Sequence, residues 1–75
     1  MMPYGFSLKE SLEKALLLEI LLSLDEEDRE CFFLHRFDGL KYKEIAVVME
    51  VPVGTVRSRI HRVVATLQER MAAYL

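Results

Sequence analysis

Three arginines stand close together in the stretch VPVGTVRSRIHRV. Arg57, Arg59 and Arg62 lie within six positions of one another, and Ser58 and His61 stand among them. The planar guanidinium group of arginine can bond O6 and N7 of guanine together, or can bind a phosphate with two parallel hydrogen bonds. Side chains of these types at this spacing predict a surface for an anionic ligand, with nucleic acid as the first candidate.

Positive charge is concentrated near the end of a chain that is acidic as a whole. The formal net charge at pH 7 is -2 over 75 residues. Residues 1–50 contain six Lys or Arg against eleven Asp or Glu, whereas residues 51–75 contain four Arg against Glu69 alone. This sorting indicates that the last third faces a polyanion, while the acidic remainder limits attraction to other polyanions.

Several other function classes are excluded by residue types and spacing. The chain offers no nucleophile with a neighbouring base and no glycine-rich phosphate loop, so we expect no enzyme. His35 and His61 lack metal-ligand spacing, and we expect neither a metal nor a cofactor. Cys31, the single cysteine, is interpreted as a core residue of a protein in a reducing compartment, the cytoplasm. The apolar run at residues 15–24 contains Glu19 and is about half of the ~20 residues that a bilayer requires, so no membrane span is predicted.

The spacing of apolar residues predicts one small all-α domain with four helices. A chain this short supports a single core, and strand signals are scarce. We expect a disordered or tag-like segment at residues 1–7 and the domain at residues 8–75. A first helix is predicted at residues 8–23, with Ser7 as its N-cap and Glu10 completing a capping box. Its leucine stripe is wider than one core face requires, which indicates a partner surface or self-association.

The second helix is expected to begin at Ser23 or Asp25. Residues 25–28 are all acidic, and carboxylates are favoured at the positive end of a helix dipole. An acidic binding site is the alternative interpretation of this run. The dipeptide Asp38 and Gly39 is expected to end the helix. The aromatic side chains expected to fill the core are Phe32, Phe33 and Phe37.

A third helix is predicted at about residues 41–49 and a fourth at residues 53–73. Pro52 is expected to stop the third helix, because a proline continuing it would clash with a preceding carbonyl. The residues expected to point inward from the third helix are Ile45, Val48 and Met49. The predicted core stripe of the fourth helix, at a period of 3.6 residues, is Val56, Ile60, Val63, Val64, Leu67, Met71 and Tyr74.

Together the third and fourth helices predict a helix-turn-helix without a wing. The small side chain of Ala46 permits close approach of the two helices, and Val51 and Val56 are expected to fill the angle between them. The basic first turns of the fourth helix are then free to enter a major groove, which is about 12 Å wide and accommodates an α-helix.

Two motifs at a fixed separation resemble region 4 of the bacterial sigma-70 family, in particular its extracytoplasmic-function group. The first motif is GLKYKEIA, in which GL, Y and EIA match the family. The second is PVGTVRSRIHR, in which P, GTV, SR and the final R match. The resemblance covers residues 24–70. It implies a module that binds the promoter minus-35 element and contacts the flap of the RNA polymerase β subunit. It also implies that an anti-sigma factor can occlude the module.

Carried onto this sequence, the resemblance implies a role for each side chain in the DNA-binding surface. The residues at base-reading positions are Arg57, Ser58, His61 and Arg62. Thr55 and Arg59 stand at positions that help with phosphates. Tyr42 and Lys43 match positions that approach the DNA backbone, and either His35 or Arg36 supplies a basic contact near the end of the second helix.

The sequence also departs from the family pattern. Many relatives have Ser or Thr at the position of Lys41, so the usual side-chain cap is missing and Lys41 is expected to contact phosphate instead. Glu50 replaces a common glycine, and a non-glycine residue at positive φ there would cost about 1 kcal/mol. The family's region 2 is not in this sequence, so we expect an excised domain or a stand-alone module. The alternatives are a LuxR-like (GerE-type) regulator and a protein-interaction module that binds polymerase or an anti-sigma factor.

Overall fold

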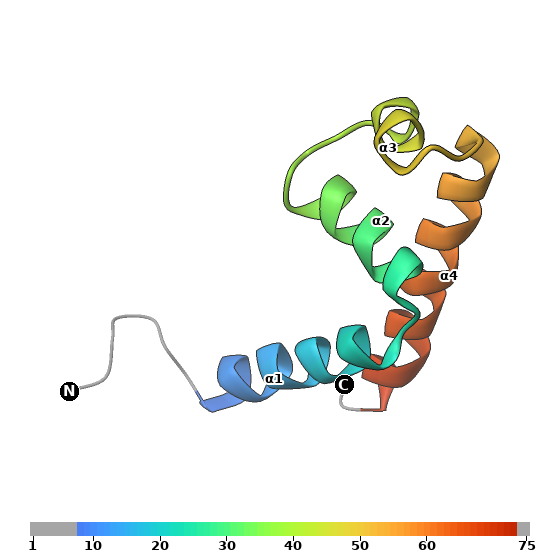
Figure 1. The fold of residues 1–75 in the computed structure, drawn as a ribbon. Coiled ribbons are helices and arrows are strands. Elements are labelled where there is room, and N and C mark those ends of the chain that lie inside the picture. Colours follow the sequence, from blue (N-terminus) through green and yellow to red (C-terminus); the bar gives the residue numbers. More distant parts are fainter. Residues whose placement is uncertain (1–7, 74–75) are drawn as a thin grey trace.

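The computed structural model describes residues 8–73 of the chain. Within this part the backbone forms four helices and no strand, which confirms the predicted all-α fold (Figure 1). The helices are α1 (Leu8–Ser23), α2 (Glu26–Arg36), α3 (Tyr42–Met49) and α4 (Val53–Ala72). The predicted N-cap Ser7, the segment at residues 1–7 and the core position Tyr74 lie outside the described residues. None of the described helices is long and apolar enough to cross a membrane.

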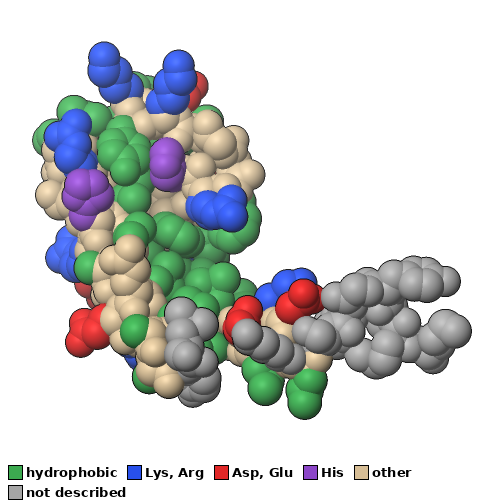
Figure 2. Space-filling view, turned by 180° about the vertical axis from the view of Figure 1, so that it is seen from behind, with side chains coloured by type: hydrophobic (Ala, Val, Ile, Leu, Met, Phe, Trp, Pro, Cys, Tyr) green, Lys and Arg blue, Asp and Glu red, His purple; other side chains and the backbone are tan. Residues whose placement is uncertain are grey.

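The longest helix, α4, holds the domain together. It packs against α1, α2 and α3, and its 20 residues correspond to a length of about 30 Å. Figure 1 shows α3 along its axis at one end of α4, so that the two helices cross steeply, while α1 projects sideways from the other end. The view from behind shows the same projection of α1 from the body (Figure 2). The predicted helix-turn-helix is therefore present, with α2 packed along its inner side.

The helix-turn-helix is built around a compact apolar cluster. Its fully buried members are Cys31, Ile45, Val56 and Ile60. The partly buried side chains around them are Leu34, Leu40, Tyr42, Ala46, Met49 and Val51. Burying each large aliphatic side chain contributes roughly 1.5–3 kcal/mol. The cluster thus joins α2, α3 and α4, and confirms that Cys31 is a core residue and that Val51 and Val56 fill the angle between the helices.

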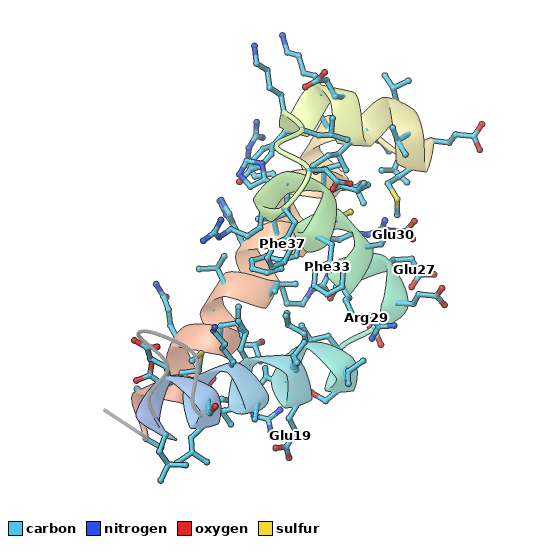
Figure 3. The ribbon with its side chains drawn as sticks, turned by 90° about the vertical axis from the view of Figure 1, so that its left-hand side faces the viewer. Glu19, Glu27, Arg29, Glu30, Phe33 and Phe37 are labelled. Atoms are coloured by element: carbon cyan, nitrogen blue, oxygen red, sulfur yellow. The ribbon has the colours of Figure 1, made fainter. Side chains whose placement is uncertain are left out.

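The phenylalanines contribute less to the core than expected. Phe37 is 62% exposed, and Phe32 and Phe33 are only partly buried. The three rings pack against one another instead, with 5.4 Å between the centroids of Phe33 and Phe37, which lie side by side in Figure 3. The reason is geometric, because Cys31 and Leu34 already direct one face of α2 inward, and Phe37 follows the end of that helix.

The prediction that Val48 and Val64 lie in the core is also wrong. Val48 is 58% exposed, whereas Ile45 is buried and Met49, one turn after Ile45, packs against the cluster. In α4 the exposed fraction of Val64 is 36%, while Val63 is buried. In both helices the buried stripe is therefore narrower than predicted.

The connection between α1 and α2 is fixed by an arginine rather than by a side-chain cap. Asp25 occupies the N-cap position of α2 but its side chain makes no capping hydrogen bond, and the Ser23 hydroxyl donates back to the carbonyl of Ile20 at 2.6 Å. Arg29 Nη1 donates to the carbonyl oxygens of Leu21 at 3.3 Å and Leu24 at 3.2 Å. These bonds satisfy carbonyls that the end of α1 leaves without helical partners.

The turn between α3 and α4 begins with a Schellman motif. The N–H of Val51 donates to the carbonyl of Ala46 at 3.0 Å, and that of Glu50 donates to Val47 at 3.3 Å. Glu50 has φ 57° and ψ 46°, which confirms the expected left-handed conformation. This motif ends α3 before Pro52, so the proline serves as the N-cap residue of α4 instead of stopping α3. At the start of α3 the backbone N–H of Lys41 donates to Glu44 Oε1 at 2.8 Å.

Candidate nucleic-acid interface

The outward face of the first half of α4 carries the side chains predicted to read bases. Arg57, Ser58, His61 and Arg62 are all exposed, whereas Val56, Ile60 and Val63 of the same helix are buried. Positions three and four residues apart are neighbours on a helix surface, so the four exposed side chains share one face. Thr55 and Arg59 are partly buried at the edges of this face. The structure thus brings together the six side chains predicted on α4.

Further basic side chains surround this face on α2 and α3. Lys41 and Lys43 are exposed at the start of α3, and Arg36 is exposed at the end of α2. Figure 2 shows blue and purple side chains gathered over the upper part of the molecule, where the helix-turn-helix lies. Most red side chains visible in that view lie lower down. The cationic surface therefore extends beyond α4 to the neighbouring ends of α2 and α3.

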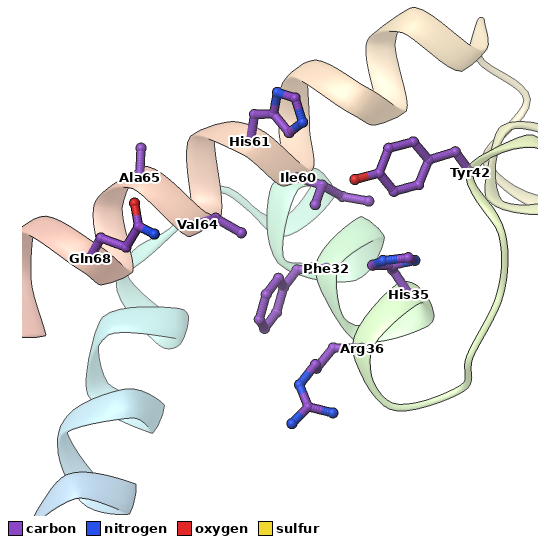
Figure 4. A pocket seen from close by; sticks show the side chains of 9 residues that line it. All are labelled: Phe32, His35, Arg36, Tyr42, Ile60, His61, Val64, Ala65 and Gln68. Carbon is purple, nitrogen blue, oxygen red and sulfur yellow. The ribbon is translucent and has the colours of Figure 1, made fainter.

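A hollow of about 310 Å³ lies within this surface, between α2 and α4 (Figure 4). It is lined by Phe32, His35, Arg36, Tyr42, Ile60, His61, Val64, Ala65 and Gln68. Figure 4 shows His61 on one side and His35 and Tyr42 on the other. Its lining is largely apolar and aromatic, but it includes the hydroxyl of Tyr42, the imidazole of His61 and the guanidinium of Arg36, groups that can donate hydrogen bonds to a nucleic-acid backbone.

The structure separates the two candidates at the end of α2. His35 Nδ1 lies 2.9 Å from the carbonyl oxygen of Leu40, and its ring meets that of Tyr42 edge-on with 4.9 Å between centroids. These contacts link α2 to the start of α3 and occupy one face of His35. Arg36 contacts the exposed ring of Phe37, with 5.8 Å from its guanidinium carbon to the centroid. Arg36 is therefore the better placed of the two to reach a ligand, while Tyr42 is partly buried by its ring contact.

Arg62 forms an ion pair with Asp28, one of the four acidic residues expected to be favoured by the dipole of α2 or to form an acidic binding site. Arg62 Nε lies 3.1 Å from Asp28 Oδ2 in the first turn of α2. The Asp28 side chain is 8% exposed, whereas that of Arg62 is 61% exposed. The spacing indicates only the inward position of Asp28, which stands three residues before Cys31 on the same face of α2, and it does not indicate the partner.

An apolar groove lies apart from the cationic surface, between α1 and α2. It has a volume of about 360 Å³ and is lined by Leu17, Leu18, Leu21, Phe33, Phe37 and Asp38. Figure 3 shows Phe33 and Phe37 above α1, while Glu27 and Glu30 point away to the other side of α2 and Glu19 points away beneath α1. The domain therefore presents two surfaces of different chemistry.

Comparison with known proteins relates this arrangement to one family. The family described as Sigma-70, region 4 matches residues 14–67. The ECF RNA polymerase sigma-E factor of Escherichia coli (strain K12) is 45% identical over 60 residues, which are 80% of this chain and 31% of that protein. The identically named protein of Salmonella typhimurium (strain LT2) gives the same values.

A second relative matches a shorter segment more closely. The RNA polymerase sigma-H factor of Pseudomonas aeruginosa is 50% identical over 44 residues, which are 59% of this chain and 23% of that protein. The chain thus spans less than a third of the length of the curated relatives it matches.

Proposed function

Because the chain belongs to the sigma-70 region 4 family, we propose that it is the promoter-binding domain of an extracytoplasmic-function sigma factor and reads the minus-35 element. The observation that carries this proposal is the outward face of α4, where Arg57, Ser58, His61 and Arg62 are exposed together. The domain recruits DNA and polymerase to each other and catalyses no reaction itself.

In the proposed complex the first half of α4 lies in the major groove. Arg57 and Arg62 donate to guanine O6 and N7 or to a neighbouring phosphate, and Ser58 and His61 contact adjacent base edges. Thr55 and Arg59, at the borders of the face, bind phosphates. Beside the face of α4, further phosphate contacts come from the start of α3 and the end of α2. These residues are Lys41, Tyr42 and Lys43 at the start of α3 and Arg36 at the end of α2. Base contacts give choice of sequence, and phosphate contacts give register and affinity.

The affinity of this one domain for DNA is expected to be modest and dependent on salt. Each neutralised phosphate adds about -0.9 to the slope of log K against log salt concentration. The proposed surface offers only a few such contacts, so the isolated chain binds weakly. In a complete factor the rest of the protein and the polymerase supply the remaining affinity.

The apolar groove between α1 and α2 is the proposed contact for a protein partner, either the flap of the polymerase β subunit or an anti-sigma factor. Phe37 and Leu18 are 62% and 56% exposed in it, and exposed apolar patches of this kind mark protein-binding surfaces. This groove is also the specific observation that favours the second candidate function, a protein-interaction module with negligible DNA affinity of its own.

DNA binding tests the first candidate directly. A duplex selected from a random pool and a scrambled duplex are titrated with the 75-residue chain, with fluorescence anisotropy as the readout, at several salt concentrations. Arg62→Ala should lower the preference for the selected duplex by about 5- to 100-fold, the effect of one good base contact. Lys43→Ala should weaken binding to both duplexes alike and reduce the salt slope by about 1.

The two other candidates predict different results. Equal affinity of the unmodified chain for selected and scrambled duplexes would contradict sequence reading and leave the interaction module. Selected duplexes that carry inverted repeats, with two chains bound per duplex, would favour the LuxR-like alternative.

A further inference from the structure

We propose that Asp28 is a positioning residue for base reading, because it holds the Arg62 guanidinium by its Nε edge and leaves the outer edge free for DNA. This inference rests on the proposed function. It adds a residue outside the helix-turn-helix to the specificity of the surface, at the beginning of α2.

The ion pair connects two helices that are far apart in the sequence. Asp28 lies in the first turn of α2 and Arg62 in the third turn of α4, and their Oδ2 and Nε atoms are 3.1 Å apart. The carboxylate end is buried, with 8% of the side chain exposed, while the arginine end is 61% exposed. The arginine is thus anchored at its base and open at its tip.

The chemistry of the guanidinium group makes this anchoring compatible with DNA binding. Arginine has five N–H donors, one on Nε and four on the two Nη atoms. Asp28 uses Nε, so both Nη atoms remain available for a two-bond contact with guanine O6 and N7 or with a phosphate. A protein side chain that blocked the contact with DNA would instead have to occupy Nη1 and Nη2.

Burial of the carboxylate keeps the pair intact when DNA arrives. A buried charge is costly unless it is paired, so departure of Arg62 would leave the Asp28 carboxylate buried without a compensating charge. The helix dipole alone accounts for an exposed acid in this turn, as Glu26 and Glu27 are exposed, but it does not account for a buried one. The pairing therefore explains both the position and the burial of Asp28.

Replacing Asp28 by Asn tests this role. The carbonyl oxygen of Asn still accepts a hydrogen bond, but the charge that fixes Arg62 is lost. We expect the ratio of affinities for selected and scrambled duplexes to fall by about 2- to 10-fold, the effect of having to order one long side chain on binding. The scrambled duplex should bind no more weakly than before, since the variant gains one unit of positive charge.

Glu27→Gln is the matched control. It makes the same change of charge in the same turn of α2, but Glu27 is exposed. It should leave the affinity ratio unchanged. In an Arg62→Ala background, Asp28→Asn should have no further effect on the ratio, because the side chain that it positions is gone.

A measurement on the unmodified chain does not depend on the folding of a variant. The Nε–H signal of Arg62 in a ¹⁵N-resolved NMR spectrum should be slow to exchange with solvent and should remain so when DNA is added. Loss of this protection in the DNA complex would overturn the inference, because it would show that Arg62 leaves Asp28 to bind.

The remaining outcomes separate the inference from the proposed function. An unmodified chain that prefers the selected duplex, together with Asp28→Asn that keeps the full preference, would overturn only the positioning role. An unmodified chain without any preference would overturn both.

Discussion

The surfaces at the two ends of α4 differ in chemistry. The first half of α4 lies against α2 and α3 and exposes Arg57, His61 and Arg62, whereas the second half lies beside α1, which exposes four leucines. Leu8, Leu12, Leu18 and Leu22 of α1 have exposed fractions of 75%, 60%, 56% and 71%. The difference teaches that one continuous helix can join two surfaces of different chemistry, a cationic one at one end and the exposed leucines of α1 at the other, and these carry the two proposed contacts.

Packing differs between the same two regions. The helix-turn-helix encloses a cluster to which three helices contribute, including Cys31, Ile45 and Val56. Among the side chains of α1 that the structure describes, only Ile20 and Leu21 are buried, although the helix has 16 residues. The core of the helix-turn-helix is therefore closed by its own three helices, while α1 retains apolar surface that a partner can cover.

The largest expected effect comes from truncating a side chain at the centre of the helix-turn-helix core. Ile45 is 0% exposed, and Ile45→Ala should lower the free energy of unfolding by about 2–5 kcal/mol, through lost burial and the cavity left behind. Chemical denaturation followed by circular dichroism at 222 nm measures this. The control is Val47→Ala in the same helix, where the side chain is 77% exposed and the change should stay within about 0.5 kcal/mol. Equal effects of the two variants would contradict the burial of Ile45 at the centre of the cluster.

A pair of arginines in α4 tests the division of tasks along this helix. Arg57 lies on the exposed face of the first half, while Arg70 Nη1 donates to Ser23 Oγ at 3.1 Å near the end of α1. The two positions are about 20 Å apart along the helix axis. Arg57→Ala should weaken binding to the selected duplex by about 5- to 100-fold, since it removes a contact worth about 1–3 kcal/mol.

Arg70→Ala makes the same change of charge at the other end. Its effect on DNA affinity in the same anisotropy titration should be less than about 2-fold, because exposed charges more than a Debye length of about 8 Å away are screened. A loss as large as that of Arg57→Ala would indicate that DNA attraction follows net charge and that the two halves do not differ.

Much of this fold could be predicted from the sequence because its signals are local. The four helices follow from apolar spacing and from breaks at Asp38 and Gly39 and around Pro52, and their observed bounds agree closely with expectation. The exposed face of α4 is predicted by the same period, since Val56, Ile60 and Val63 form the buried stripe and Arg57, Ser58, His61 and Arg62 lie on the opposite side. The roles of the exposed side chains stay predictions.

The errors arose where a neighbour decides what is covered. Nothing local distinguishes Phe37 from a core aromatic, and its 62% exposure follows from the position of α2 relative to α1. In the same way Val48 fits the apolar pattern of α3, but no helix covers that side of it. The pairing of Asp28 with Arg62 depends on how α2 lies against α4, which sequence spacing does not specify.

The smallest expected effect concerns backbone strain in the turn between α3 and α4. Glu50 has φ 57°, a conformation that costs a non-glycine residue about 1–2 kcal/mol. In the turn between α2 and α3 a glycine, Gly39, has the positive φ, at 73°. Glu50→Gly should therefore raise the free energy of unfolding, but by only about 0.5–1 kcal/mol, because glycine also has more conformational freedom to lose on folding. The urea midpoint at constant slope measures this change.

Glu50→Ala separates relief of strain from loss of the exposed carboxylate. Alanine removes the same charge but keeps a Cβ, so the left-handed conformation stays costly and the variant should be no more stable than the unmodified chain. If Ala stabilises the domain as much as Gly does, the gain comes from removing a negative charge at the C-terminal end of α3, where the helix dipole disfavours it, and the turn is not strained. If only Gly does so, the strain lies in the residue that closes the Schellman motif of α3 and sets the angle at which α4 leaves the turn.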